Sequence, residues 1–362
     1  MKIKNIFFAA ILVLAGFSCS MEDDAIMNDV EKGIEEATEA YTVLDFGVAF
    51  NEMATKASTT VVPGEDRPAT GDENNDEKKI SEVSVFLLED GKVIGILIPQ
   101  NRNQVSSNSD GSITLKDLKF VTKYKTNRTL EAHVVINGNQ FLKNINIGDA
   151  QSALNQQISG CLSADQLIKY GSTRIVFGKD ITNSYSSPSV AENNSTTILV
   201  KVSHVAARLD FSQFDVTLKG FEGDPTVVFD EAKFVNLQQN GKIVEGDASV
   251  NVKDGAFLNR SNRIGTGWID MGTAYGYANQ YRQDSEMNTA LYVKFTVDGR
   301  TFEKTYPINP AGITKEVDHN GIKGGYLYDI KVRWTITPDW GDSTIEFYTR
   351  DWVHNSIPEI VL

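Results

Sequence analysis

Residues 41–58 read YTVLDFGVAFNEMATKAS, and within them LDFGVAF (44–50) alternates as a β-strand does. One face of this segment carries large apolar side chains: Leu44, Phe46, Val48 and Phe50. Such alternation is typical of a strand that covers a core. Burying four side chains of this size contributes roughly 6–12 kcal/mol before opposing terms, at about 1.5–3 kcal/mol each. The strand is therefore expected to supply much of the stability of the domain that contains it.

Removal of this strand would leave an apolar groove bordered by unpaired backbone groups, and such a groove demands a replacement strand. The C-terminal segment 344–362, TIEFYTRDWVHNSIPEIVL, alternates again and ends in an apolar tail. Exchange of strands between subunits is β-augmentation, and its head-to-tail repetition builds an open filament. The alternative is that both ends are ordinary strands of one monomer. The tail residues that would fill the groove are Ile357, Ile360, Val361 and Leu362.

The N-terminus has the features of an export signal. A basic start, MKIKN, precedes the twelve apolar residues 6–17, which are too few to span a bilayer. The signal ends at Cys19 in a pattern that resembles the lipobox of bacterial lipoproteins, although Gly16 stands where leucine is usual. We predict a signal peptide over residues 1–19 and lipidation of Cys19. A plain secretory signal with an incidental cysteine is the alternative.

Charge and cysteine content limit which partners the chain can bind and whether disulfides can stabilise its fold. The formal net charge of −13 argues against nucleic acid or anionic membrane surfaces as partners, because no basic face is available. Residues 1–56 hold four lysines and ten acidic residues, so a chain that starts at Ala57 carries 31 − 38 = −7. With Cys19 acylated, the only other cysteine, Cys161, has no partner for an intramolecular disulfide. Apolar cores alone must then hold the exported protein together.

The rest of the chain has the pattern of β-structure. Seven Asp-Gly or Asn-Gly pairs punctuate it, and such pairs favour tight hairpins. The clearest hairpins are expected over residues 80–98 and 291–308. A two-turn helix is expected over SADQLIKYG, between a cap at Ser163 and Gly171. Many short strands with few helices favour an all-β protein built of sandwiches over a parallel α/β sheet.

We divide the chain at the points where its composition changes. An acidic tether precedes the strand of residues 41–50, and a polar segment rich in Ser and Asn gives way to a long apolar strand near Ser195. The predicted parts are a signal peptide (1–19), a tether with the removable N-terminal strand (20–56), an N-terminal β-sandwich domain (57–195) and a C-terminal β-sandwich domain with the donor tail (196–362).

No residue pattern supports catalysis. The four histidines are not at metal-ligand spacing, and the chain has no HExxH, CxxC, GxSxG or P-loop motif. Asp72, Asn74 and Asp76 have the spacing of a calcium loop, but Glu77 stands where that loop needs glycine. A solvated acidic loop is the better interpretation. We therefore expect no catalytic residue, no metal and no cofactor, and we do not expect an enzyme.

Three of the four tryptophans, Trp334, Trp340 and Trp352, lie in the last 29 residues. They could form a surface on which sugars stack, which makes a surface-exposed outer-membrane lipoprotein that binds glycans the alternative function. An aromatic core beneath a C-terminal sheet is the favoured interpretation of these residues.

Several of these segments resemble the fimbrillin (FimA-like) family of major pilins, which are lipoprotein precursors of type V pili. The similar features are the signal that ends at Cys19, the strand followed by Lys56-Ala57, the hairpin ISEVSVFLLEDGKVIG (80–95), the segment VKVSHVAARLDF (200–211) and the block INPAGITKEVDHNGIKGGYLYDIKVRW (308–334). His204 stands where arginine is frequent in that family. The resemblance implies two tandem transthyretin-like (Greek-key) β-sandwich domains.

The resemblance also implies a route of assembly. A trypsin-like protease at the outer membrane would cut after a basic residue and release the lipidated N-terminal strand, and a C-terminal strand of a neighbouring subunit would fill the groove. The matching bond here is Lys56–Ala57, although arginine is usual at the family's cut site. Arg67 is disfavoured because Pro68 follows it and restricts the extended backbone that a protease must bind.

The predicted function follows from this resemblance. The chain is expected to be a structural subunit of a fimbrium that serves cell adhesion, held by a lipid anchor in the outer membrane as a precursor and then extracellular. The expected partners are copies of itself or related pilin subunits and the processing protease, with no nucleic acid.

Overall fold

The computed structural model describes residues 39–50, 75–109, 112–244, 248–255, 268–279, 286–308, 321–351 and 359–360. Strands dominate this part of the chain, and the α-helices found in it, α1 (Asn139–Leu142) and α2 (Pro188–Glu192), are short. No helix within these ranges is long and apolar enough to cross a membrane. All the named elements belong to one compact unit, Ala40–Leu362. The expected all-β fold of sandwiches with few short helices is confirmed.

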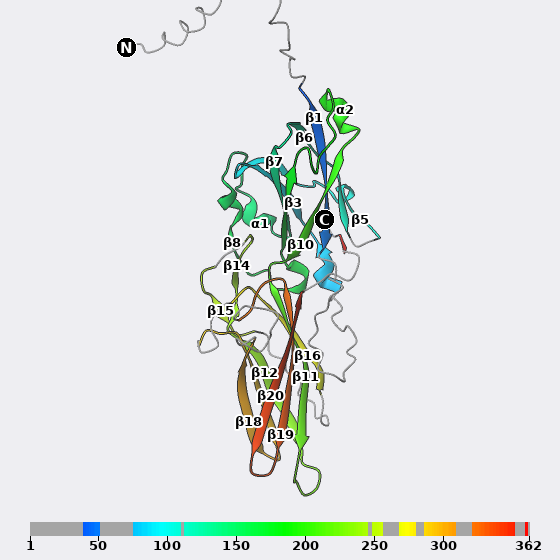
Figure 1. Ribbon diagram of the computed structural model, residues 1–362. Coiled ribbons are helices and arrows are strands. Elements are labelled where there is room, and N and C mark those ends of the chain that lie inside the picture. Colours follow the sequence, from blue (N-terminus) through cyan, green and yellow to red (C-terminus); the bar gives the residue numbers. More distant parts are fainter. Residues whose placement is uncertain are drawn as a thin grey trace, which may run out of the picture. The chain divides into compact units, whose positions relative to one another are not determined.

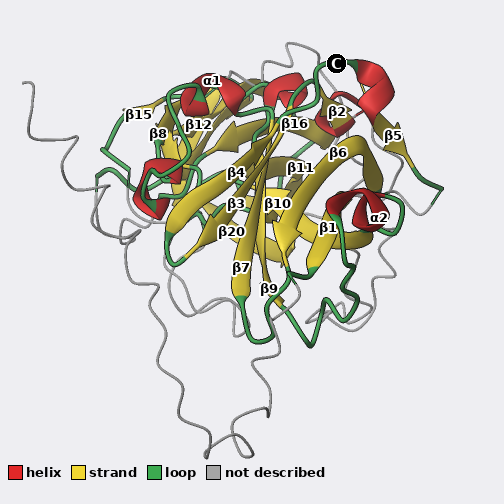
Figure 2. Cartoon of the chain, turned by 90° about the horizontal axis from the view of Figure 1, so that it is seen from above, coloured by secondary structure: helices red, strands yellow, loops and turns green. Residues whose placement is uncertain are grey.

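The first sandwich has the hydrogen-bonded strand order β4-β3-β7-β9-β10-β1-β6-β5 (Figures 1 and 2). In chain order these strands are β1 (Tyr41–Phe50), β3 (Val83–Glu89), β4 (Lys92–Leu97), β5 (Val105–Ser107), β6 (Ile113–Lys123), β7 (Thr129–Ile136), β9 (Lys169–Val176) and β10 (Thr196–His204). Strand β10 pairs with β1 over most of its length and with β9 only at Ser203 and His204. It therefore joins two layers, β5-β6-β1-β10 and β9-β7-β3-β4, and one apolar cluster draws its residues from both.

The second sandwich places a four-stranded sheet, β16-β11-β19-β20, against a three-stranded sheet, β12-β17-β18. Their bounds are β11 (Ala207–Leu218), β12 (Val227–Val235), β16 (Trp268–Gly276), β17 (Ala290–Val297), β18 (Arg300–Pro307), β19 (Tyr326–Ile336) and β20 (Gly341–Asp351). Three short pairs complete the described sheets: β2 (Lys79–Ile80) with β21 (Glu359–Ile360), β8 (Gln157–Ser159) with β14 (Asn240–Lys242), and β13 (Leu237–Gln238) with β15 (Val252–Lys253).

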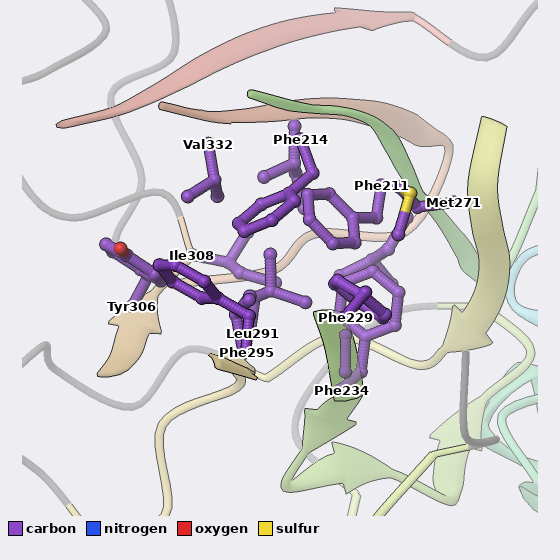
Figure 3. Packing of buried hydrophobic residues seen from close by; sticks show 14 of the residues in the cluster. Phe211, Phe214, Phe229, Phe234, Met271, Leu291, Phe295, Tyr306, Ile308 and Val332 are labelled. Atoms are coloured by element: carbon purple, nitrogen blue, oxygen red, sulfur yellow. The ribbon is translucent and has the colours of Figure 1, made fainter. Parts of the chain in front are cut away.

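Aromatic rings fill the core of the second sandwich (Figure 3). The ring of Phe214 meets those of Phe229 and Phe295 edge-on, each at a centroid distance of 5.3 Å. Trp334 lies edge-on to Phe295 at 5.1 Å and is 6% exposed. Edge-to-face contact is a preferred geometry of aromatic pairs. Trp334 is therefore a core residue, as the favoured interpretation of the tryptophans expected.

The first sandwich passes into the second between β10 and β11. The sequence suggested one long strand over TILVKVSHVAARLDF (197–211), but β10 ends at His204 and β11 begins at Ala207. The carbonyl oxygen of Val205, between these strands, would lie 2.1 Å from a Cβ placed on Gly324, so the two backbones are in direct contact there. The chain passes from the first sandwich to the second about ten residues after Ser195, where the division was predicted. Strand β10, which lies between these points, pairs with β1 and so belongs to the first sandwich. The assignment of two separate domains stays a prediction.

The expected helix over SADQLIKYG is wrong. Only a single 3-10 turn, η4 (Ala164–Gln166), forms there, and the side chain of Ser163 makes no capping hydrogen bond. Leu167, Ile168 and Lys169 are all buried, at 0%, 1% and 0% exposure. Three consecutive buried side chains suit an extended segment between two packed layers, whereas a surface helix would turn at least one of them to solvent. Tertiary packing thus overrides the local capping signal.

Gly171, at the third position of β9, is expected to tolerate no side chain. A Cβ at this position would lie 1.8 Å from the carbonyl oxygen of Lys201 on β10. The substitution Gly171→Ala should lower the free energy of unfolding by about 3 kcal/mol or more, since the clash is with backbone. Denaturant titration measures this. The matched variant Ser172→Ala, at an exposed neighbour, should change the value by no more than about 0.5 kcal/mol. Equal stability of the two variants would contradict the expectation.

His133 on β7 is expected to make stability depend on pH. It is 2% exposed, and its Nδ1 lies 2.8 Å from the hydroxyl of Tyr170. Burial lowers the pKa of His133 below its ordinary value of 6.5, and the neighbouring Glu131 only partly opposes this. The unfolded chain therefore takes up the proton first, and stability is lost as the pH falls below about 6.5. Between about pH 7.5 and pH 5, the melting temperature of His133→Gln should fall by less than that of the wild-type chain. An equal fall in both proteins would refute this prediction.

Candidate functional site

Strand β1 lies inside its sheet although it stands near the start of the described chain (Figure 1, blue). On one side it runs parallel to β10, with Leu44 opposite Thr196 and Phe50 opposite Val202. On the other side it runs antiparallel to β6, from Tyr41 opposite Lys123 to Val48 opposite Ile113. Both edges of β1 are therefore occupied. We call the space that it fills between β10 and β6 the β1 slot.

The inner face of β1 lies in the core of the first sandwich. Leu44, Phe46 and Val48 are 0% exposed, and Phe50 is 6% exposed. They share one apolar cluster with residues of β3 and β7 in the opposite layer, such as Val85. The four side chains of the proposed removable face thus lie together in one core. Without β1, the empty slot would expose the centre of this core to solvent.

The outer face of β1 is covered as well, which alternation in the sequence did not show. Val43, Gly47 and Ala49 are buried on this face. Helix α2 packs against β1 and β6 (Figure 2). The helix is fixed at its end by a hydrogen bond of 2.6 Å from the ammonium group of Lys119 on β6 to the carbonyl oxygen of Glu192. A strand that enters the β1 slot must therefore fit on both faces.

The pairing of β1 with β6 is interrupted at Asp45. Leu44 lies opposite Phe120, whereas Phe46 lies opposite Leu115, because the intervening residues of β6 bulge out of register. Asp117 at the bulge has a φ of 58°, a value that an L-residue rarely adopts. Bulges of this kind break the ladder and leave residues of the partner strand without their usual neighbours.

Two outward positions of β1 fit their surroundings imperfectly. The Oδ2 atom of Asp45 accepts a hydrogen bond from the hydroxyl of Ser195, while its Oδ1 atom is buried and has no hydrogen-bond partner among the described residues. A Cβ placed on Gly47 would lie 3.1 Å from the carbonyl oxygen of Ile113 and 3.2 Å from Cδ1 of Leu199. The first position buries an unsatisfied acceptor, and the second leaves almost no room for a side chain.

A buried polar network surrounds Glu77, which lies in the first described element after β1. Glu77, in the turn η1 (Asn75–Lys78), is 0% exposed and accepts a hydrogen bond of 3.0 Å from Arg208 on β11. The hydroxyl of Tyr275 on β16 also donates to Glu77, and the ammonium group of Lys169 donates to its carbonyl oxygen at 2.9 Å. These contacts connect η1 to both sandwiches.

The charges of this network determine its protonation. Burial alone would lower the pKa of Arg208, but Asp210 and Glu77 outweigh it and the pKa is raised. Burial and then the charge of Glu77 raise the pKa of the Tyr275 hydroxyl, which keeps it a donor. No local pattern indicated this role for Glu77, because a single glutamate in an acidic segment looks like any other.

Most of the remaining predicted residues lie outside the described part of the chain. Cys19, Lys56, Ala57, Arg67 and the tail residues Ile357, Val361 and Leu362 lie outside the described residues. The backbone of Ile360 pairs in parallel with that of Ile80 in the same chain. Among the tryptophans, Trp334 is buried, Trp340 is 55% exposed, and Trp352 lies outside the described residues. Trp334 therefore cannot contribute to a sugar-stacking surface.

The β1 slot is lined by apolar side chains and by the backbone edges of β10 and β6. In the ranges that the structure describes, no three His, Cys, Asp or Glu side chains gather as metal ligands would. The thiol of Cys161 is half-buried and accepts a hydrogen bond from the side chain of Gln140, and burial raises its pKa.

No family model matches the chain, and no curated protein matches its sequence. Solved structures do match. A candidate cell adhesion protein from Parabacteroides distasonis ATCC 8503 is 17% identical, with a TM-score of 0.58 over 88% of this chain and 99% of that one. The chain shares its fold. A second candidate adhesion protein from the same organism is 12% identical, with a TM-score of 0.51 over 87% and 99% of the two chains.

Fimbrial proteins are also among the solved structures that match. A fimbrilin from Porphyromonas gingivalis W83 is 14% identical, with a TM-score of 0.49 over 86% of this chain and 98% of that chain. The likeness of fold itself rests on the two candidate cell adhesion proteins.

Proposed function

We propose that the chain is a structural subunit of a bacterial fimbrium that is joined to its neighbours by replacement of β1. The observation that carries this proposal is the position of β1. A segment next to the N-terminal tether fills the interior of a sheet, with both edges paired and both faces buried. The names of the two candidate adhesion proteins with this fold support a role in cell adhesion.

A single cut would make β1 replaceable. Lys56 stands six residues after the end of β1 at Phe50. Cleavage of the Lys56–Ala57 bond would leave β1 held only by its contacts in the slot, still attached to the anchor at Cys19. Departure of the strand would then expose two unpaired sheet edges and an apolar core. Both strongly favour the binding of another strand. Copies of this chain or related subunits are the proposed donors, with the tail residues Ile357, Ile360, Val361 and Leu362.

Limited digestion of the purified precursor with trypsin tests this proposal. We expect a cut after Lys56, shown by N-terminal sequencing, followed by ladders of non-covalent oligomers on electrophoresis without boiling. The variant Lys56→Gln should stay uncut at this bond and monomeric. A precursor that is cut after Lys56 and stays monomeric over a range of conditions would overturn the proposal.

A further inference from the structure

We propose that the β1 slot selects the strand that replaces β1 at the two outward positions now held by Asp45 and Gly47. The incoming strand carries an uncharged hydrogen-bonding side chain at the first position and a residue no larger than alanine at the second. This inference rests on the proposed function, and it names the chemistry of the partner strand: an extended segment of another subunit with these two features.

The Asp45 position favours an uncharged side chain. Ser195, just before β10, supplies one donor to Oδ2, and the buried Oδ1 has no donor among the described residues. The bulge in β6 removes the residue that would otherwise lie opposite Asp45 in the ladder. A buried acceptor without a donor is costly, and a charged one more so. Asparagine, serine or threonine can accept the hydrogen bond from Ser195 without burying a charge.

The Gly47 position favours a small side chain. The carbonyl oxygen of Ile113 belongs to the backbone of β6 and cannot move without disturbing the ladder beside it. Leu199 on β10 closes the same space from the other side with its Cδ1 atom, although half of its side chain, 51%, is exposed. A Cβ alone would require small shifts, whereas a branched side chain must displace Leu199.

The position of Asp45 also explains why a donor strand would bind the slot more tightly than β1. A donor that matches the inner face of β1 gains no more apolar burial than β1 itself, so the inner face alone cannot favour replacement. The buried Oδ1 atom of Asp45, which has no hydrogen-bond partner among the described residues, is a defect of the resident strand. A donor without this defect binds the slot more tightly than β1 does, and the equilibrium then favours exchange between subunits.

Peptide competition tests the selection. A specific protease site inserted after Ala57 nicks the full chain without relying on cleavage at Lys56, and labelled peptides of residues 40–51 then compete with the resident β1. The peptide with Asp45→Asn should bind about tenfold more tightly than the wild-type peptide. The peptide with Gly47→Val should bind about tenfold more weakly, and an acceptor with Leu199→Ala should recover part of that loss, because the contact with the carbonyl oxygen of Ile113 remains.

Two different failures are distinguishable. If no peptide enters the nicked protein, the wild-type peptide included, the slot does not exchange strands and the proposed function falls together with this inference. If all three peptides bind equally, or if Leu199→Ala leaves the effect of Gly47→Val unchanged, the selection is refuted while strand replacement stands.

Discussion

Replacement of Phe46 by alanine is expected to lower the free energy of unfolding by about 3–5 kcal/mol, the usual cost of removing a buried phenylalanine. The side chain is 0% exposed and lies in the middle of β1, within the cluster that joins both layers of the first sandwich. Denaturant titration of the intact chain measures this loss. In chain nicked after Ala57, the same change should also shorten the time for which β1 stays bound, since the strand is then held by such contacts alone.

Phe295 provides the matched control for Phe46. It is equally buried, but it lies on β17 in the core of the second sandwich. Phe295→Ala should reduce the stability of the intact chain by a similar amount and leave the release of β1 from nicked chain unchanged. Release at the same rate from both variants would show that β1 is retained by the stability of the whole unit rather than by its own slot.

Replacement of Glu77 by alanine is the second change with a large expected effect. It would leave Arg208, whose side chain is 11% exposed, without one of its two carboxylate partners, and Tyr275 without the acceptor of its hydroxyl. Breaking a buried ion pair by removing one partner costs about 3–5 kcal/mol. We expect a loss of that size in denaturant titration, and a smaller loss for Glu77→Gln, which keeps the acceptor but not the charge.

Asp76 is the control for this effect. Its carboxylate forms an ion pair of 2.7 Å with Lys79 in the same turn, but its side chain is 51% exposed. An exposed pair of this kind contributes at most about 1 kcal/mol, so Asp76→Ala should change stability little. Equal losses for Glu77→Ala and Asp76→Ala would mean that the buried network does not hold η1 against β11 and β16.

Features that depend on neighbouring residues could be predicted from the sequence. The alternation of residues 41–50 located β1, and two Asp-Gly pairs located hairpins. Asp90-Gly91 connects β3 to β4 with φ values of 49° and 72°, and Asp298-Gly299 connects β17 to β18 with 46° and 81°. Positive φ at both central residues is what a tight hairpin of this kind requires, so the local chemistry decides the outcome.

Features that depend on distant partners could not be predicted in this way. Asn240-Gly241 has the same hairpin signal but lies inside β14, paired with β8. Asn137 also has a positive φ, 58°, yet its side-chain oxygen is used to accept a hydrogen bond of 2.9 Å from the backbone of Ser81. At the candidate site, the bulge opposite Asp45 and the buried partners of Glu77 come from segments far away in the chain, and no local pattern shows them.

The parallel pairing of β1 with β10 has a consequence for the time course of folding. Leu44 lies opposite Phe120 and opposite Thr196, which are 76 and 152 residues later in the chain. Contacts between residues so far apart form slowly, since a long loop must close first. A folding chain is therefore expected to pass through a stage in which its β1 is free and its slot is open. At that stage the β1 of a neighbouring chain would compete for the slot, so the local concentration of incompletely folded chains would decide whether each chain closes on itself.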